Sequence, residues 1–207
     1  MPVWTISAQA GTPGAEVAAG LAARAEVPLF DRDSLVSIVS ALSPELGDLD
    51  DVEGRFGGRL NALALGVAMT YGAPGAFREL ELRRTLPELG RKVVGEIARR
   101  PAVILAAAAA LALLDRPGAV HTRLWAPEEW RVASYSRSEM VDRARAARDL
   151  AHADHVERNW VRALFDVRVD DPALYTVVLD ASRLAPDRIV DVLLAAAGKS
   201  SMRDLPR

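Results

Sequence analysis

Apolar residues are grouped along the chain in short runs, and longer segments of mixed polarity separate them. The short runs lie at 3–7, 27–31, 103–105 and 175–180, and apolar and polar residues alternate over 120–126, which predicts a further strand. Runs of this length are typical of strands that are buried on both faces of a sheet. Several are followed by a segment with helical spacing of its apolar residues, such as 15–24 and 186–197. This order predicts an α/β fold of three layers, in which a parallel five-stranded sheet lies between helices.

Two long segments interrupt this order, and both are predicted to be largely helical. The segment 36–100 separates the second predicted strand from the third. The segment 138–165 mixes arginines with acidic residues, which usually indicates a helix whose face lies in solvent. A shorter helix is expected at 106–114, directly after the third strand, because alanine is the best helix former. Gly198 is expected to end the last helix of the chain, as glycine often does.

The composition fits one compact domain and excludes several classes of function. The chain has 207 residues, half of them hydrophobic, and a net charge of −2 at pH 7. One domain over 1–207 is therefore expected, and no excess of positive charge indicates nucleic acid or an anionic membrane as a partner. The sequence contains no cysteine, which excludes disulfides, cysteine-ligated zinc and thiol catalysis. The longest apolar run, 102–114, is shorter than the roughly 20 residues of a membrane span, and the amino terminus lacks the pattern of a signal peptide, so a cytoplasmic protein is expected.

A glycine-containing turn joins the first predicted strand to the first predicted helix. Gly11 and Gly14 lie in it, and such a turn directs backbone N–H groups and the positive end of the helix dipole toward one point. Two interpretations fit these glycines: a turn that binds phosphate, or a tight connection between strand and helix. In a standard P-loop the second glycine is followed by lysine and then serine or threonine, whereas here Ala15 and Glu16 follow. Thr12 is expected either to offer its hydroxyl to a ligand or to cap the helix.

Short motifs at the amino end, in the middle and near the carboxyl end match those of one kinase family. They are Thr5-Ile6-Ser7, Val27-Pro28-Leu29-Phe30-Asp31-Arg32-Asp33, Leu124-Trp125-Ala126-Pro127, Asp171-Pro172-Ala173-Leu174-Tyr175 and Leu179-Asp180-Ala181-Ser182-Arg183-Leu184. In these motifs the chain resembles the cytidylate kinase-like family, a branch of the nucleoside monophosphate kinases with a P-loop kinase-like fold. The resemblance implies ATP and Mg²⁺ as cofactors and a nucleoside monophosphate, CMP or dCMP, as the phosphate acceptor. It also implies a helical acceptor-binding insertion over about 36–100 and a lid over about 131–168.

The resemblance also assigns site residues. Those expected to bind the nucleotide cofactor are Gly11, Thr12, Gly14 and Glu16, those near the acceptor are Asp31 and Arg32, and those of the catalytic lid are Arg145, Asp149 and His152. Two of these groups have structural alternatives. Asp31 follows a strand and would equally serve as a cap, and the spacing of the three lid residues also fits a solvated helix face. No metal site is expected, because His152 and His155 have no evident third ligand.

The cations that such a kinase needs are missing at three positions. Where the family carries arginine, this chain has Ala8, Ala15 and Ala107. Phosphoryl transfer depends on cations that neutralise the charge spreading over the phosphate. Three hypotheses therefore remain: a nucleoside monophosphate kinase, a kinase-like fold that acts on another small molecule, and a catalytically inactive homologue that serves as a nucleotide sensor or an interaction scaffold. The segment 60–69 is interpreted either as a core helix or as the face of a homodimer.

Overall fold

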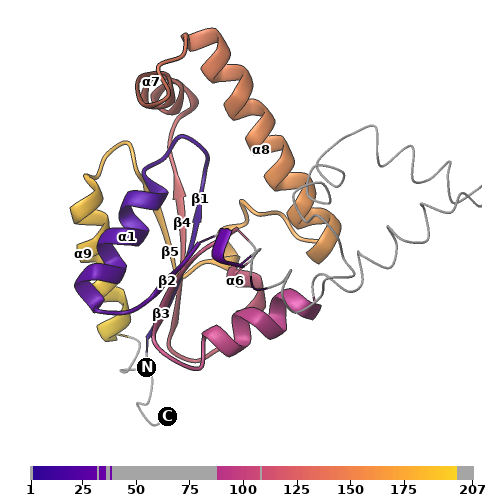
Figure 1. Ribbon diagram of the computed structural model, residues 1–207, viewed down its shortest axis with the longest axis vertical. Coiled ribbons are helices and arrows are strands. Elements are labelled where there is room, and N and C mark those ends of the chain that lie inside the picture. Colours follow the sequence, from indigo (N-terminus) through magenta and orange to yellow (C-terminus); the bar gives the residue numbers. More distant parts are fainter. Residues whose placement is uncertain (1, 32, 36–37, 39–87, 108, 200–207) are drawn as a thin grey trace, which may run out of the picture.

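The sheet is the centre of the computed structural model, which describes residues 2–31, 33–35, 38, 88–107 and 109–199. Five parallel strands form it: β1 (Val3–Ala8), β2 (Leu29–Phe30), β3 (Ala102–Leu105), β4 (Ala119–Trp125) and β5 (Val177–Asp180). Their order across the sheet is β2-β3-β1-β4-β5, so the first strand of the chain is the central one. The parallel five-stranded sheet and its place between helices confirm the predicted fold class (Figure 1).

Helices lie on both faces of this sheet, and two more rise above the ends of its strands (Figure 1). They are α1 (Gly14–Ala25), α6 (Ala109–Ala112), α7 (Glu128–Ser138), α8 (Arg143–Phe165) and α9 (Pro186–Lys199), with a helical segment at 88–97 and a 3₁₀ turn, η2 (Pro172–Leu174). α1 and α9 pack together on one face, whereas α6 and the segment 88–97 cover the other. α7 and α8 pack against each other at the end of the sheet where β1 runs into α1.

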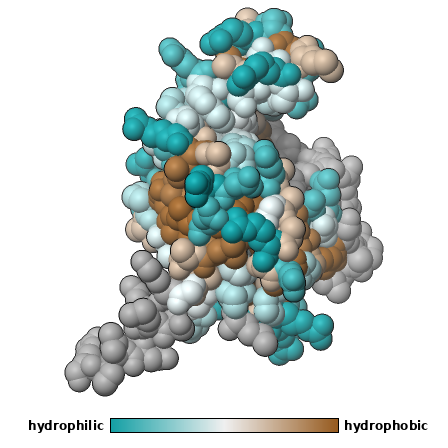
Figure 2. All heavy atoms as spheres, turned by 90° about the vertical axis from the view of Figure 1, so that its left-hand side faces the viewer, coloured by the Kyte–Doolittle hydropathy of each residue, from teal (hydrophilic) through white to brown (hydrophobic). Residues whose placement is uncertain are grey.

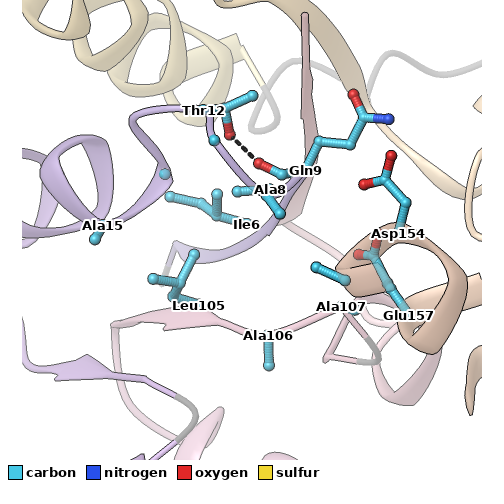
Figure 3. A pocket seen from close by; sticks show the side chains of 14 residues that line it. Ile6, Ala8, Gln9, Thr12, Ala15, Leu105, Ala106, Ala107, Asp154 and Glu157 are labelled. Carbon is cyan, nitrogen blue, oxygen red and sulfur yellow. Dashed lines mark hydrogen bonds between the residues drawn. The ribbon is translucent and has the colours of Figure 1, made fainter. Parts of the chain in front are cut away.

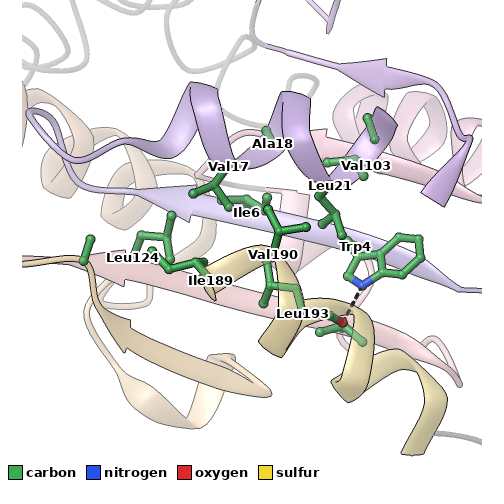
Figure 4. Packing of buried hydrophobic residues seen from close by; sticks show 13 residues of the cluster. Trp4, Ile6, Val17, Ala18, Leu21, Val103, Leu124, Ile189, Val190 and Leu193 are labelled. Carbon is green, nitrogen blue, oxygen red and sulfur yellow. Dashed lines mark hydrogen bonds between the residues drawn. The ribbon is translucent and has the colours of Figure 1, made fainter. Parts of the chain in front are cut away.

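The larger hydrophobic core lies between the sheet and the pair formed by α1 and α9 (Figure 4). Leu21 of α1 and Ile189 of α9 are buried there against Ile6 of the central strand. Trp4 belongs to the same core, and its indole N–H donates to the Leu193 carbonyl oxygen at 3.0 Å. Because α1 begins only a few residues after β1, this core also fixes the turn between them.

The opposite face of the sheet carries buried polar side chains. Side chains alternate between the faces of a strand, so Thr5 and Ser7 of β1 lie beside their register partners His121 and Arg123 of β4. The His121 ring lies between Thr5 Oγ1, 2.8 Å from Nδ1, and the Leu113 carbonyl oxygen, 3.1 Å from Nε2. Buried polar groups cost free energy unless they are hydrogen-bonded. These contacts therefore hold β1 and β4 in register.

The outer surface of α1 and α9 is shown in Figure 2. Hydrophobic residues form a patch in the middle of this view, and hydrophilic residues surround it. Val192 of α9 is among the large apolar side chains that remain exposed. No described helix combines the length and the apolar composition that crossing a membrane requires.

The long charged segment is helical, as predicted, but its helix begins later than the predicted segment does. The segment was predicted over 138–165, whereas α7 ends at Ser138 and α8 begins at Arg143. Asp142 is extended between them, and its carboxylate accepts a hydrogen bond from Arg145 N at 2.9 Å. An aspartate in this position is a favourable N-cap, so the break has a local cause in the sequence.

Other expectations about element ends were also wrong. The helix expected at 106–114 is limited to the short α6, and Gly198 lies within α9 instead of ending it. Of the expected insertion at 36–100, only residue 38 and residues 88–100 are described. The segment 60–69, interpreted as a core helix or a dimer face, lies outside the described residues.

Candidate functional site

The turn between β1 and α1 is closed by hydrogen bonds of its own. Thr12 donates to the Gln9 carbonyl oxygen from its backbone N–H (3.1 Å) and from its hydroxyl (2.6 Å). Gly11 has φ of +81°, a backbone conformation that glycine adopts readily. Pro13 is the N-cap residue of α1, and no side chain caps this helix, so Thr12 does not have the capping role that was one alternative for it. The N–H groups of the first helical turn are therefore left to solvent or to a ligand.

Both glycines of the turn are required by their surroundings. A Cβ atom at Gly14 would overlap the Cβ atom of Ala8. A Cβ atom at Gly11 would come within 3.0 Å of Leu150 Cδ2 and 3.1 Å of Arg131 Cβ. The turn thus lies directly against α7 and α8, and close packing alone is a sufficient reason for the two glycines.

A cavity of about 340 Å³ opens beside this turn, at the carboxyl ends of β1 and β3 (Figure 3). Gly11, Thr12 and Gly14 line it, which brings together three of the four residues that were predicted to bind the nucleotide cofactor. The fourth, Glu16, lines a separate cavity of about 430 Å³ together with Trp130. Ligands of open α/β sheets bind at the carboxyl ends of the strands. The cavity beside the turn is therefore the candidate site.

Three alanines of the cavity lining stand where the family resemblance leads us to expect arginine. Ala8 is the last residue of β1, Ala15 lies in the first turn of α1, and Ala107 follows β3. The fold brings all three to one cavity, where Leu105 and Ala106 add further apolar surface (Figure 3). This wall offers a phosphate no positive side chain.

Two arginines lie next to the cavity, and each is bound by a carboxylate of α8. Arg123 of β4 donates to both carboxylate oxygens of Glu157, at 2.7 and 3.0 Å. Arg131 of α7 donates to both carboxylate oxygens of Asp154, at 3.0 and 2.9 Å. Glu157 and Asp154 line the cavity, as Figure 3 shows, whereas neither arginine does. The charges next to the cavity are therefore paired and cancel.

Both guanidinium groups have further acceptors on the protein. Arg123 donates to Ser7 Oγ at 2.5 Å, and Arg131 donates to the carbonyl oxygens of Ala126 (3.2 Å) and Ala10 (3.1 Å). Burial disfavours the charged form of Arg123, but hydrogen bonding and attraction from Glu157 outweigh this effect, and the pKa of Arg123 is raised above its ordinary value. The Arg123 guanidinium is therefore positively charged at neutral pH.

Sequence analysis missed these two ion pairs, because it treated the charged helix as solvated. Asp154 and Glu157 continue a buried stripe of α8 that also contains Ala146, Leu150 and Val161. Intervals of three and four residues are those of a helix side that faces a core. Acidic residues within such a stripe were the available signal for buried cationic partners.

Asp31, one of the two predicted acceptor residues, does not line the cavity. Asp31 Oδ1 accepts hydrogen bonds from Ser34 Oγ (2.6 Å) and Ser34 N (2.9 Å), and these bonds lower the pKa of Asp31. This is the geometry of a cap on the helical residues that follow, which was the structural alternative for Asp31. Arg32 lies outside the described residues.

The predicted lid residues lie on the outer side of α8. Arg145 and Asp149 form an ion pair at 3.5 Å in which the side chains are 63% and 41% exposed, and His152 is exposed too. None of the three lines the cavity, which α8 reaches instead through Ala153 and the two carboxylates. Their placement matches a solvated helix face, the alternative that the sequence left open.

The cavity lining does not fit a complex of magnesium with a triphosphate. Mg²⁺ needs oxygen ligands that are free to coordinate it. The carboxylates of Asp154 and Glu157 are each held through both oxygens by a guanidinium group, which neutralises them and competes with a metal ion for the same oxygens. Among the described residues, no group of three or more His, Asp or Glu side chains is placed to hold a metal ion.

Comparison with known proteins agrees with the fold and the sequence motifs. The sequence profile of the cytidylate kinase-like family matches residues 3–183. A crystal structure of an uncharacterized protein from Eubacterium ventriosum ATCC 27560 is similar with a TM-score of 0.69 and 14% sequence identity, over 96% of this chain and 99% of that one. The crystal structure of TT1252 from Thermus thermophilus is less similar, with a TM-score of 0.48 and 20% identity over 94% of this chain and 97% of that one. A gluconokinase from Sinorhizobium meliloti 1021 has a TM-score of 0.49 and 14% identity over 96% of this chain and 92% of that one. No curated protein is significantly similar in sequence.

Proposed function

Because the chain belongs to the cytidylate kinase-like family, we propose that it is a catalytically inactive kinase homologue that binds a nucleotide without transferring its phosphate. The observation that carries this proposal is the charge at the candidate site. Ala8, Ala15 and Ala107 meet in one cavity, and the arginines next to it are paired with Glu157 and Asp154. Such a protein would act as a nucleotide sensor or an interaction scaffold.

The missing cations bear on the rate of transfer more than on the fold. The transferred phosphoryl group spreads negative charge over its oxygens in the transition state, and positive groups must be in place to stabilise it. Loss of one buried charged contact costs at least about 2 kcal/mol. Three independent losses of this size would slow transfer by about 10⁴-fold.

Binding places a smaller demand on the site than catalysis does. The N-terminus of α1 presents backbone N–H groups and the positive end of the helix dipole, and no side chain caps it. Backbone donors are independent of the side chains that the chain has lost. We therefore expect the phosphate of a mononucleotide to be held at Gly14 and Ala15, where α1 begins at the cavity.

Two measurements on the purified protein test this function together. Isothermal titration with CMP, dCMP and ATP, each with and without Mg²⁺, is expected to show weak binding of a mononucleotide that does not depend on Mg²⁺. A coupled assay with ATP, CMP and Mg²⁺ is expected to show no ADP formation above that of a blank without protein. Steady ADP formation would refute inactivity, and absence of nucleotide binding would refute the sensor role.

A charge placed at the start of α1 makes the binding test specific. Ala15→Glu puts a carboxylate into the cavity lining and is expected to abolish nucleotide binding through repulsion. Ala19→Glu adds the same charge to an exposed position one turn further along α1, so it is expected to bind as the wild type does. Equal binding by the two variants would place the phosphate elsewhere.

The second candidate is ATP-dependent phosphorylation of CMP or dCMP. The turn between β1 and α1 favours it, because Gly11 of this turn has a positive φ and lines the cavity, as expected of a turn that binds phosphate. This activity would need cations from outside the described residues, and the sequence has Arg55 and Arg59 there. ADP formation that falls in an Arg55→Ala, Arg59→Ala double variant would support it.

A further inference from the structure

The two carboxylates of α8 separate a pair of arginines from the candidate site. The side chains of Arg123 and Arg131 are each 6% exposed, whereas those of Glu157 and Asp154 are 17% and 12% exposed and line the cavity. An anion in the cavity would therefore meet the carboxylates first.

We propose that Arg123 and Arg131 form a latent receptor for phosphate-type anions, which Glu157 and Asp154 occupy from within the protein. The carboxylates would thus inhibit anion binding at this cavity. The proposal concerns regulation of anion binding at the cavity that the proposed function uses. It rests on that function only for the location of the anion site.

The chemistry of the two ion pairs supports this assignment. A guanidinium group presents its donors in a planar fork that matches the oxygens of a carboxylate and of a phosphate equally well. Each arginine here holds both oxygens of one carboxylate. The same donors would hold two oxygens of a phosphate if the carboxylate were absent.

The guanidinium groups are held in place by contacts that do not involve the carboxylates. Arg123 keeps its bond to Ser7 Oγ, and Arg131 keeps its bonds to the carbonyl oxygens of Ala126 and Ala10. Ala10 also lines the cavity, so Arg131 is attached to the turn between β1 and α1. A receptor that is positioned in advance loses little affinity to ordering.

The carboxylates are likewise held by packing rather than by the ion pairs alone. Ala146, Leu150 and Val161 of α8 are buried on the same side of the helix. Leu150 packs with Val132 of α7, and the turn residue Ala10 lies against the same cluster. A soluble anion must therefore compete with carboxylates that cannot diffuse away, which gives them a high effective concentration.

Removing one carboxylate tests the proposal in the full-length protein. Glu157→Ala and Asp154→Ala are each expected to lower the thermal unfolding midpoint in chloride, because they leave a buried cation unpaired. Phosphate or pyrophosphate, added at constant ionic strength, is expected to restore part of this midpoint with a saturable dependence. Calorimetric titration is expected to show pyrophosphate binding at least about tenfold tighter than in the wild type.

A control variant separates a specific receptor from a general effect of charge. Glu96→Ala also removes one carboxylate from an arginine pair, but Arg99 and Glu96 are exposed at the surface. It is expected to show no gain in phosphate affinity. Gains in Glu157→Ala and Asp154→Ala that are no larger than in Glu96→Ala would overturn the proposal.

A second pair of variants, in which the side chains keep their size and shape, tests the proposal if the alanine variants do not fold. Glu157→Gln and Asp154→Asn remove only the charge, and their refolding yields in phosphate and in chloride are compared. A gain from phosphate that exceeds the gain of the wild type supports the receptor, because phosphate stabilises folded proteins in general, and an equal gain would contradict it. If none of the four variants folds in either salt, the proposal is overturned, because the guanidinium groups would then not keep their places without the carboxylates.

The wild-type titrations distinguish this proposal from the proposed function. Phosphate binding by the variants together with no nucleotide binding by the wild type would contradict the proposed function and support the latent receptor. Nucleotide binding by the wild type, without a gain in phosphate affinity in the variants, would support the proposed function and contradict the latent receptor.

Discussion

Gly14→Ala adds one methyl group at the point where α1 leaves the sheet. The new Cβ atom would overlap the Cβ atom of Ala8, and neither atom can rotate away because both are attached directly to the backbone. Overpacking of this kind costs about 1–3 kcal/mol, since β1 and α1 must move apart to relieve it. Urea denaturation followed by circular dichroism measures the loss. A loss of about 2 kcal/mol would lower the melting temperature by roughly 4–8 °C in a protein of this size.

Gly20→Ala is the matched control, because it makes the same change in the same helix. Its Cβ atom would lie 3.5 Å from Val190 Cγ2, which is an ordinary contact. Alanine is favoured over glycine inside a helix by about 1 kcal/mol, so this variant is expected to equal or exceed the wild type in stability. Adding Ala8→Gly to Gly14→Ala removes the second Cβ atom and should recover most of the loss. Equal stability of the two alanine variants, or no recovery in the double variant, would refute the close contact.

Two further predictions concern a buried histidine and a restored cation. Burial lowers the pKa of His121, so its contribution to stability is complete above the unfolded-state pKa of about 6.5 and declines as the pH falls below that value. Urea denaturation between pH 5 and 8 should show this decline in the wild type and a flatter profile in His121→Gln. Ala107→Arg returns a cation to the cavity lining and is expected to tighten ATP binding about tenfold at low salt, measured by calorimetry, whereas Ala107→Gln should not.

The order of strands and helices could be predicted because it depends on local patterns. Most strands are short apolar runs, β4 alternates apolar with polar residues, and the central strand is followed at once by the turn at Gly11 and Gly14. The family motifs implied that Ala8, Ala15 and Ala107 lie at one site, and the structure shows that all three line one cavity. Sequence patterns of this kind record which residues face the core, and they record the turns that join elements.

The ion pairs could not be predicted in the same way, because their partners are far apart in the chain. Arg123 and Glu157 are 34 positions apart, and Arg131 and Asp154 are 23 apart. A charge that faces solvent and a charge that faces a buried partner look alike in one sequence. Only the helical spacing of Asp154 and Glu157 with Leu150 separates them from the solvated residues of α8, such as Arg145.

The two ion pairs also affect the stability of the site when no ligand is bound. Several arginines that converge on an empty cavity repel one another, and a kinase offsets this repulsion when the phosphates of its substrates bind. With alanine at 8, 15 and 107 the repulsion is absent, and Arg123 and Arg131 have partners within the protein. Catalytic sites often lower the stability of the proteins that carry them, so relief from catalysis allows a site to change in the stabilising direction. If that is the history of this cavity, neutralising Asp154 or Glu157 should cost stability and restore attraction for phosphate in the same variant.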